Sequence, residues 1–168
     1  MVKKQKGFTL VELLVAIGIL GVVGGIATII LFTTLRSASK SDIMREVKQN
    51  GDYAISVMER MIRNATGVES TCLGSGTSLT INNPDGRTTT FSLGGTSNIQ
   101  IASVSALGTG FLTNEKVAAT GLNFTCSRTP GKPDVVSINF TLSQPGTPTR
   151  PEERALINFQ TTVSLRTY

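Results

Sequence analysis

The feature that most constrains this chain is an apolar stretch near its beginning. The 28 residues from Phe8 to Leu35 contain a single charged side chain, Glu12. An α-helix needs about 20 apolar residues to cross a bilayer, so this stretch is long enough to span one. Lys3, Lys4 and Lys6 precede it and predict that the start of the chain stays on the cytoplasmic side. We therefore expect one membrane-spanning helix near the N-terminus.

Three interpretations of this stretch compete. A secretory leader has an apolar region of about 7–15 residues followed by a small-residue cleavage site. Ser37-Ala38-Ser39 is a weak match to such a site, but the apolar stretch is longer and contains a carboxylate. A plain membrane anchor fits the length but gives no reason for Glu12, because an acidic side chain at the centre of a span costs about 2.5–3.5 kcal/mol. The third interpretation depends on the residues just before Glu12.

The segment Lys6-Gly7-Phe8-Thr9-Leu10-Val11-Glu12 resembles the processing signal of type IV prepilins and type II secretion pseudopilins. The signal is specific, since a basic leader, a glycine, a phenylalanine and a glutamate occur together at fixed spacing. In that family a prepilin peptidase cuts after the glycine, on the cytoplasmic side, and methylates the new N-terminus. The resemblance implies cleavage between Gly7 and Phe8, with residues 1–7 as the leader and residues 8–35 as the transmembrane and assembly half of the helix.

The resemblance also implies a role for Glu12 in assembly. Cleavage after Gly7 creates an α-amine at Phe8, and Glu12 lies four residues further along, on the same face of a helix. In the family this glutamate meets the amine of a neighbouring subunit. A buried charge left without its partner is costly, so Glu12 and Phe8 would set the register in which subunits dock.

The resemblance further implies a location and a set of partners. The protein would be a single-pass protein of the cytoplasmic (inner) membrane with an extracytoplasmic C-terminal domain, and would then enter a pilus or pseudopilus. Its partners would be the prepilin peptidase, other pilin or pseudopilin subunits, the inner-membrane assembly platform and membrane lipid. Nucleic acid is not expected: the formal net charge is +5, three of those charges leave with the leader, and no basic cluster with interleaved aromatics follows.

The composition argues against catalysis. Histidine is absent, which removes the commonest general base and metal ligand. Glu152 and Glu153 stand between Arg150 and Arg154 and are best interpreted as a solvated loop. We expect no enzyme activity, no catalytic residue, no cofactor and no metal.

After Leu35 the sequence becomes polar but keeps a helical period. Residues 36–66 contain no proline, and apolar or small residues recur at spacings of three and four while most charges fall on other faces. This pattern predicts an amphipathic half of the same helix, packed on the domain that follows and ending near Gly67. The stripe consists of Ile43, Val47, Gly51, Ala54, Met58, Met61 and Ala65.

Glycines interrupt the apolar half of the helix. Gly21 and Gly25 stand four apart and form the best pair for close approach of a neighbouring helix. The alternative is a soft point at which the helix stretches or melts within a filament. Either use is structural.

From about Ser70 the sequence changes to short alternating runs rich in Thr, Ser and Gly, which indicate antiparallel strands. Residues 78–81 and 90–93 flank Asn82-Asn83-Pro84-Asp85-Gly86, a strong hairpin turn. Residues 108–117 are expected to form a loop. Further strands are expected at 99–104, 122–126, 136–142 and 157–165, the last three as a meander.

These elements predict an α+β fold. A long N-terminal helix would pack, by its second half, on an antiparallel sheet built from residues 67–168, the β-rich extracytoplasmic domain. This is the architecture of type IV pilin-like proteins, so the fold class agrees with the resemblance at the N-terminus.

Cys72 and Cys126 are the only cysteines. Two cysteines in a chain without histidine cannot complete a structural zinc site. An exported domain favours a disulfide between them, which would tie the segment after the helix to a central strand and contribute about 4 kcal/mol. The alternative is two free buried thiols. Either role is structural.

Two functions of different classes are therefore open. Residues 58–65 resemble the helix end of J-type minor pseudopilins and similar minor pilins, and the chain has no proline before Pro84, whereas major pilins often carry one in the membrane half of the helix. The resemblance implies a minor structural subunit of a type IV pilus or type II secretion pseudopilus. The alternative is a membrane-anchored extracytoplasmic binding module whose sheet recognises a polymer or surface ligand. Gly7, Phe8 and Glu12 favour the filament subunit, because a simple anchor does not need them.

Overall fold

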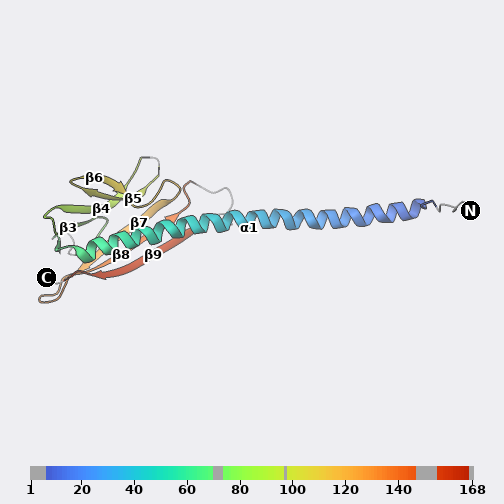
Figure 1. Cartoon of the computed structure of the whole chain (residues 1–168). Coiled ribbons are helices and arrows are strands. Elements are labelled where there is room, and N and C mark those ends of the chain that lie inside the picture. Colours follow the sequence, from blue (N-terminus) through green and yellow to red (C-terminus); the bar gives the residue numbers. More distant parts are fainter. Residues whose placement is uncertain (1–6, 70–73, 97, 147–154, 167–168) are drawn as a thin grey trace, which may run out of the picture. The chain divides into compact units, whose positions relative to one another are not determined.

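The computed structural model describes residues 7–69, 74–96, 98–146 and 155–166. The chain divides into two compact units, Met1–Ser39 and Lys40–Tyr168. Helix α1 (Leu10–Asn64) supplies the first unit and continues into the second. The second unit also contains every strand of the described residues (Figure 1).

In the first unit α1 is apolar on all sides. Its large apolar side chains from Leu10 to Leu35 are all more than half exposed. By length and composition the helix is able to cross a membrane. The hydroxyls of Thr28 and Thr34 each donate a hydrogen bond to the carbonyl one turn earlier, at 2.8 Å, so these polar groups are satisfied within the helix. The predicted helix over the apolar stretch is confirmed, although it begins at Leu10 rather than at Phe8.

The second unit contains two antiparallel sheets beside the later part of α1 (Figure 1). One sheet has the strand order β1-β3-β4-β5-β6 and the other has the order β2-β7-β8-β9. The strands are β1 (Gly67–Val68), β2 (Gly74–Gly76), β3 (Leu79–Asn82), β4 (Thr88–Gly94), β5 (Gln100–Ser105), β6 (Gly108–Phe111), β7 (Ala118–Ser127), β8 (Val135–Ser143) and β9 (Leu156–Ser164). The α+β fold class is confirmed.

The later part of α1 packs through the predicted stripe, with one change in its last turn. The sequence pattern placed Met61 in the stripe, but Met61 is only half-buried. Ile62, the next residue, takes the fully buried position. At Gly51 the helix meets the ring of Phe159 in β9, and a Cβ atom placed on Gly51 would overlap that ring. The glycine therefore allows helix and sheet to approach closely. The helix residues that are buried are Val47, Gly51, Ala54, Met58 and Ile62.

The predicted hairpin and meander are both confirmed. β3 pairs with β4 around the turn at residues 83–87, and β7, β8 and β9 pair in chain order. β8 lies at the centre of the core: its burial alternates strictly, and Phe140 stacks on Phe159 of β9 with ring centroids 5.2 Å apart. Burial of every second side chain is what the alternating sequence predicted.

Two expectations were wrong. We expected one sheet and found two, because β5 pairs with β4 and β6 rather than with β7. The predicted loop at residues 108–117 begins with a strand, since β6 folds back on β5. Gly108 and Gly110 carry no side chain to alternate, so the two-residue period that marks a strand is not visible there.

The connection from β6 to β7 joins the two sheets and is hydrogen-bonded to α1. The side chain of Asn114 donates to the carboxylate of Glu46 at 2.7 Å, and its backbone N–H donates to Asn50 Oδ1 at 3.0 Å. The hydrogen bond from Asn114 and the nearby Lys116 hold the pKa of Glu46 below its ordinary value. Hydrogen bonds of Asn114 thus hold the connection between the two sheets against α1, where the chain has no regular secondary structure.

Arg128 makes a second link between the sheets. Its guanidinium pairs with Asp134 at 2.7 Å across the β7–β8 turn and donates to the carbonyl of Val68 in β1 at 2.9 Å. The hydrogen bonds from Arg128 lower the pKa of Asp134. One side chain therefore connects an edge of the five-stranded sheet to a turn of the four-stranded sheet.

Candidate processing and assembly segment

The predicted processing site lies just before α1. Gly7, Phe8 and Thr9 have no regular secondary structure, and nothing lies within 4 Å of the position that a Cβ atom on Gly7 would take. Phe8 is exposed, with 78% of its surface accessible. The Gly7–Phe8 bond therefore lies outside the helix, in a segment without regular secondary structure.

Thr9 caps the helix that follows. The backbone N–H of Glu12 donates to Thr9 Oγ1 at 3.3 Å, and the N–H of Leu13 donates to the Thr9 carbonyl at 3.1 Å. These are the bonds of an N-cap residue, and Thr-x-x-Glu is the sequence of a capping box. We did not predict this role, although the pattern Thr9-Leu10-Val11-Glu12 carries it. A carboxylate in the first turn also complements the helix dipole.

Glu12 is exposed in the first turn of α1. The one ion pair in the described part of the chain joins Arg128 and Asp134, so the Glu12 carboxylate has no basic partner there. Phe8 lies two residues before the helix, and the expected relation of Phe8 and Glu12 on one helix face is not present in this uncleaved chain. That expectation concerns the cleaved chain and stays a prediction.

The first unit has two different sides. At 100° per residue, Glu12 shares one side of α1 with Val15, Ile19 and Ile26. The opposite side carries the glycines, whose missing side chains leave open space on the helix surface. A side with open space admits a neighbouring helix closely, while a β-branched side presents a stiff apolar ridge. The glycines are Gly18, Gly21, Gly24 and Gly25.

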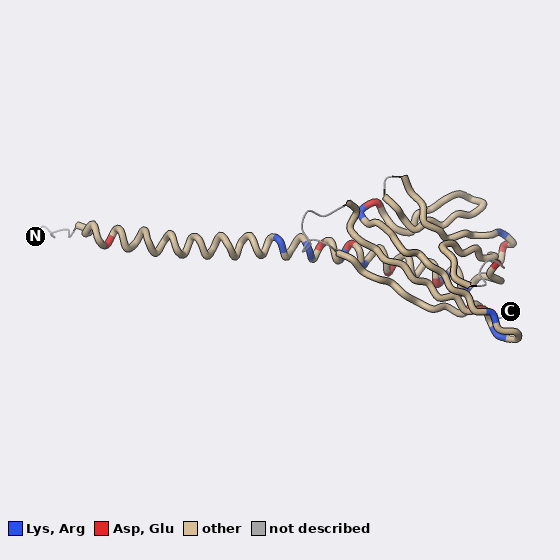
Figure 2. Tube along the Cα trace, turned by 180° about the vertical axis from the view of Figure 1, so that it is seen from behind, with Lys and Arg blue, Asp and Glu red and all other residues tan. Residues whose placement is uncertain are grey.

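Figure 2 shows how unevenly charge is distributed along the chain. Between Gly7 and Ser39 the charged residues are Glu12 and Arg36, whereas Lys, Arg, Asp and Glu are frequent on the later part of α1 and on the turns of the second unit. An uncharged apolar surface of this length suits contact with lipid or with other apolar helices.

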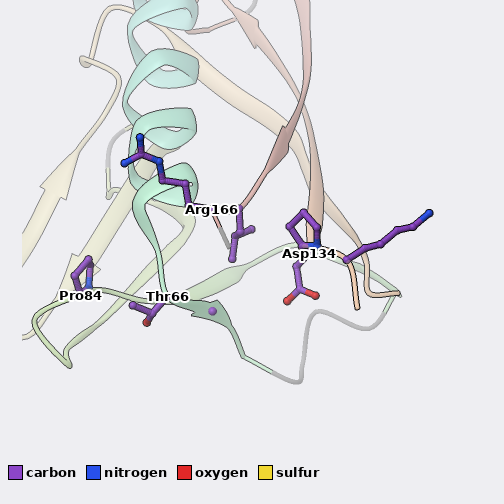
Figure 3. A pocket seen from close by; sticks show the side chains of 8 residues that line it. Thr66, Pro84, Asp134 and Arg166 are labelled. Atoms are coloured by element: carbon purple, nitrogen blue, oxygen red, sulfur yellow. The ribbon is translucent and has the colours of Figure 1, made fainter. Parts of the chain in front are cut away.

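The second unit has a hollow at the end of α1, with a volume of about 560 Å³ (Figure 3). Thr66, Pro84, Asp134 and Arg166 lie around it, and the guanidinium of Arg166 points away from the carboxylate of Asp134. Asp134 is engaged with Arg128. Lys132 also lines the hollow, and among these described residues no hydrogen bond or ion pair joins it or Arg166 to Asp134.

No group of metal-ligating side chains occurs among the described residues. The acidic pair Glu152 and Glu153, with its flanking arginines, lies outside those residues.

Cys126 lies half-buried in β7, and no described cysteine is free. Gly74 in β2 is its directly paired neighbour. Cys72, the predicted partner, lies outside the described residues, so the disulfide stays a prediction. In the sequence Cys72 stands two positions before Gly74, the residue opposite Cys126. Two residues of chain reach at most about 7 Å.

Comparison with known proteins found a family match for the N-terminal part of the chain. Residues 2–28 match the family described as the prokaryotic N-terminal methylation motif. No curated protein and no solved structure matches the chain. The matched residues include Gly7, Phe8 and Glu12, and they support the resemblance to type IV prepilins and pseudopilins that the sequence suggested.

Proposed function

We propose, on the premise that this chain carries a prokaryotic N-terminal methylation motif, that it is a structural subunit of a type IV pilus or type II secretion pseudopilus. A prepilin peptidase processes it, and it assembles with other subunits through its N-terminal helix. The observation that carries the proposal is the motif over residues 2–28 joined to a helix whose apolar side chains are exposed on every side. An exposed apolar helix needs lipid before assembly and other helices afterwards.

Processing is the first step. Cleavage of the Gly7–Phe8 bond removes residues 1–7 with Lys3, Lys4 and Lys6 and creates an α-amine on Phe8, which is then methylated. The leader lysines hold this bond on the cytoplasmic side, where the peptidase acts. The second unit is extracytoplasmic, and the chain crosses the inner membrane once.

Assembly is the second step and gives Glu12 its function. The amine of Phe8 on one subunit meets the carboxylate of Glu12 on its neighbour as the helices pack. Removing one partner of a buried ion pair costs about 3–5 kcal/mol, because the other charge stays buried alone. The inner-membrane assembly platform delivers the subunit from lipid into this contact.

The subunit is a minor one, used in few copies near a filament tip or in an initiating complex. The resemblance of residues 58–65 to J-type minor pseudopilins supports this role, as does the absence of a proline from α1. A subunit repeated along a shaft must match identical copies at every step, whereas one used a few times needs only to match unlike neighbours.

Mass spectrometry of the mature protein tests processing. The expected N-terminal residue is an N-methylated Phe8. Gly7→Leu should leave the leader in place, because a bulky side chain replaces the open position at the cleavage site, while Gly18→Leu serves as the matched control and should be processed. A mature N-terminus at Met1, or one near Lys40, would contradict the proposal.

Variants of the first turn separate ion pairing from helix capping. Glu12→Ala and Glu12→Gln should both be cleaved and inserted but should enter filaments at least about tenfold less often, because the partner of the Phe8 amine is missing. Thr9→Ala removes the cap and leaves the carboxylate, so it should assemble at close to the normal level. If Thr9→Ala is as defective as Glu12→Ala, Glu12 acts as a capping residue and the pairing account is wrong.

Counting subunits in sheared, purified filaments tests the minor role. This chain should be a small fraction of the total, and its deletion should lower filament number or secretion while the remaining filaments keep the same main protein. If this chain is the dominant component, it is a major subunit and the minor role is wrong.

A further inference from the structure

The edge of the five-stranded sheet is open at β6. This strand pairs with β5 on one side only, and all four of its residues, Gly108–Phe111, are exposed. Proteins commonly protect an edge strand with lysine, proline or a bulge. β6 contains no charged residue and no proline, so neither of these side-chain protections blocks its edge.

The backbone groups at this edge can be assigned from the ladder. Leu112 N–H donates to the Ile101 carbonyl at 2.8 Å, which makes these residues a hydrogen-bonded pair next to the Ala102–Phe111 pair. Such pairs alternate in an antiparallel ladder. Thr109 and Phe111 therefore direct their N–H and C=O groups away from β5, and no hydrogen bond joins those groups to another described residue.

The side chains of β6 leave room for a close neighbour. Gly108 and Gly110 occupy one face of the strand, and nothing lies within 4 Å of the Cβ position of either. Glycine in a strand often marks a place where another backbone approaches closely. The other face carries Thr109 and Phe111, so an added strand would meet side chains on one face only.

An aromatic hollow continues from the end of β6. It has a volume of about 440 Å³ and is lined by Tyr53 of α1, by Phe111 and by the start of the β6–β7 connection. Tyr53 is 58% exposed and Phe111 is 49% exposed. They are the only exposed aromatic side chains in the described part of the second unit, and both face one hollow. Exposed aromatic side chains are enriched at the centres of protein interfaces.

We propose that the open edge of β6 binds an extended, uncharged segment of a different polypeptide. The segment adds to the five-stranded sheet as a further strand, bonds to the outward groups of Thr109 and Phe111, and places one apolar side chain between Tyr53 and Phe111. This mode of recognition takes its affinity from main-chain hydrogen bonds and its specificity from a side-chain pocket. The surface belongs to the second unit, and the proposal does not depend on how the first unit is processed.

The size of the edge argues for a different polypeptide rather than a second copy. Four residues of strand span about 13 Å, and two β6 strands paired with each other would bury far less than the roughly 1,000 Å² that a stable interface needs. A longer segment that continues past β6 into the aromatic hollow buries more. Its chemistry follows from the strand, which offers backbone partners and apolar contacts and carries no charge. Glu115 is the charged residue among those that line the hollow.

Backbone hydrogen exchange on the full chain in detergent micelles tests the proposal. The probe is a synthetic peptide with the uncharged β5 sequence Gln100–Ser105 between terminal lysines, because this sequence forms a strand that pairs antiparallel with the opposite edge of β6. At millimolar peptide, exchange at Thr109 and Phe111 should slow by about tenfold or more. The same peptide with alternate backbone nitrogens methylated should have no effect. Unchanged exchange with the first peptide, or equal slowing with both, would overturn the proposal.

One variant pair sharpens the test. Thr109→Pro removes an outward N–H without taking a bond from β5, since edge positions that face solvent tolerate proline. It should abolish the response of Phe111 to the peptide, while Thr109→Ser should respond as the natural chain does. Exchange at Ile101 reports whether each variant is folded. A full response of folded Thr109→Pro, or slowing in the natural chain with protein concentration alone, would show that a different polypeptide strand is not what the edge binds.

Discussion

The two parts of α1 differ in where their apolar side chains lie, although they form one helix. Up to Ser39 the large apolar side chains are exposed, and the single acidic residue is at the very start. From Lys40 onward the apolar side chains form a stripe that is buried under two sheets, with charges on the other faces. The first part must find its partners outside the chain, while the second part has found them within it. Helical periodicity alone does not distinguish these cases, but the width of the apolar surface does.

Truncation of an apolar side chain should therefore have unequal consequences in the core of the second unit and in the exposed part of α1, and the largest effect is expected in the core. Phe140 is fully buried and stacks on Phe159. Phe140→Ala should lower the free energy of unfolding of the second unit by about 3–5 kcal/mol, because it leaves a cavity. Denaturant unfolding of the full chain in micelles measures this. Phe32→Ala, in the exposed part, is the control and should leave that free energy unchanged. Equal losses would mean that the two parts do not differ as described.

Reduction of the predicted Cys72–Cys126 disulfide should have the next largest effect. Breaking it frees a loop of about 50 residues in the unfolded chain and should cost about 2–5 kcal/mol in the second unit, with no effect on the helix of the first unit. Thiol labelling of denatured, unreduced protein should find no free cysteine, and unfolding with and without reductant measures the cost. Two labelled thiols would show that the link does not form.

A glycine-to-alanine substitution should change stability in opposite directions in the two parts of the helix. Gly51→Ala should destabilise the second unit by about 1–3 kcal/mol, because the new methyl group overlaps the ring of Phe159. Gly21→Ala has open space and should raise helix stability by up to about 1 kcal/mol. Unfolding of the second unit measures the first change, and hydrogen exchange in micelles measures the second. If Gly51→Ala is neutral, the close approach of α1 and β9 is not real.

The smallest expected effect concerns the connection that joins the sheets. Asn114→Ala removes the hydrogen bond that lowers the pKa of Glu46, so that pKa should rise toward its ordinary value. A lowered carboxyl pKa contributes stability above the pKa of the unfolded chain, and this contribution is lost as pH falls through the folded pKa. The variant should therefore lack this contribution at neutral pH, and its stability should fall less on acidification than that of the natural chain. NMR titration of the side-chain carboxyl carbons measures the shift, and the pKa of Asp134, which Arg128 holds down, is the internal control that should not move.

The sequence by itself determined the local features of this protein. A run of apolar residues with one carboxylate, a specific processing motif, a helical stripe and alternating strands can each be seen within a short window, because helix and strand periods are properties of neighbouring residues. The helix, the β3–β4 hairpin and the β7–β8–β9 meander follow directly. The capping role of Thr9 is equally local, since Thr-x-x-Glu at the start of a helix is the sequence of a capping box.

The tertiary structure decided how those elements pair. β1 and β2 contain two and three residues, too short to show a period, and their partners lie far along the chain. The division into two sheets depends on β6 returning to β5, on Asn114 binding Glu46 and on Arg128 reaching Val68. The open edge at β6 results from the same pairing. Contacts of this kind depend on which distant surfaces fit together in the folded chain, and no local pattern records that choice.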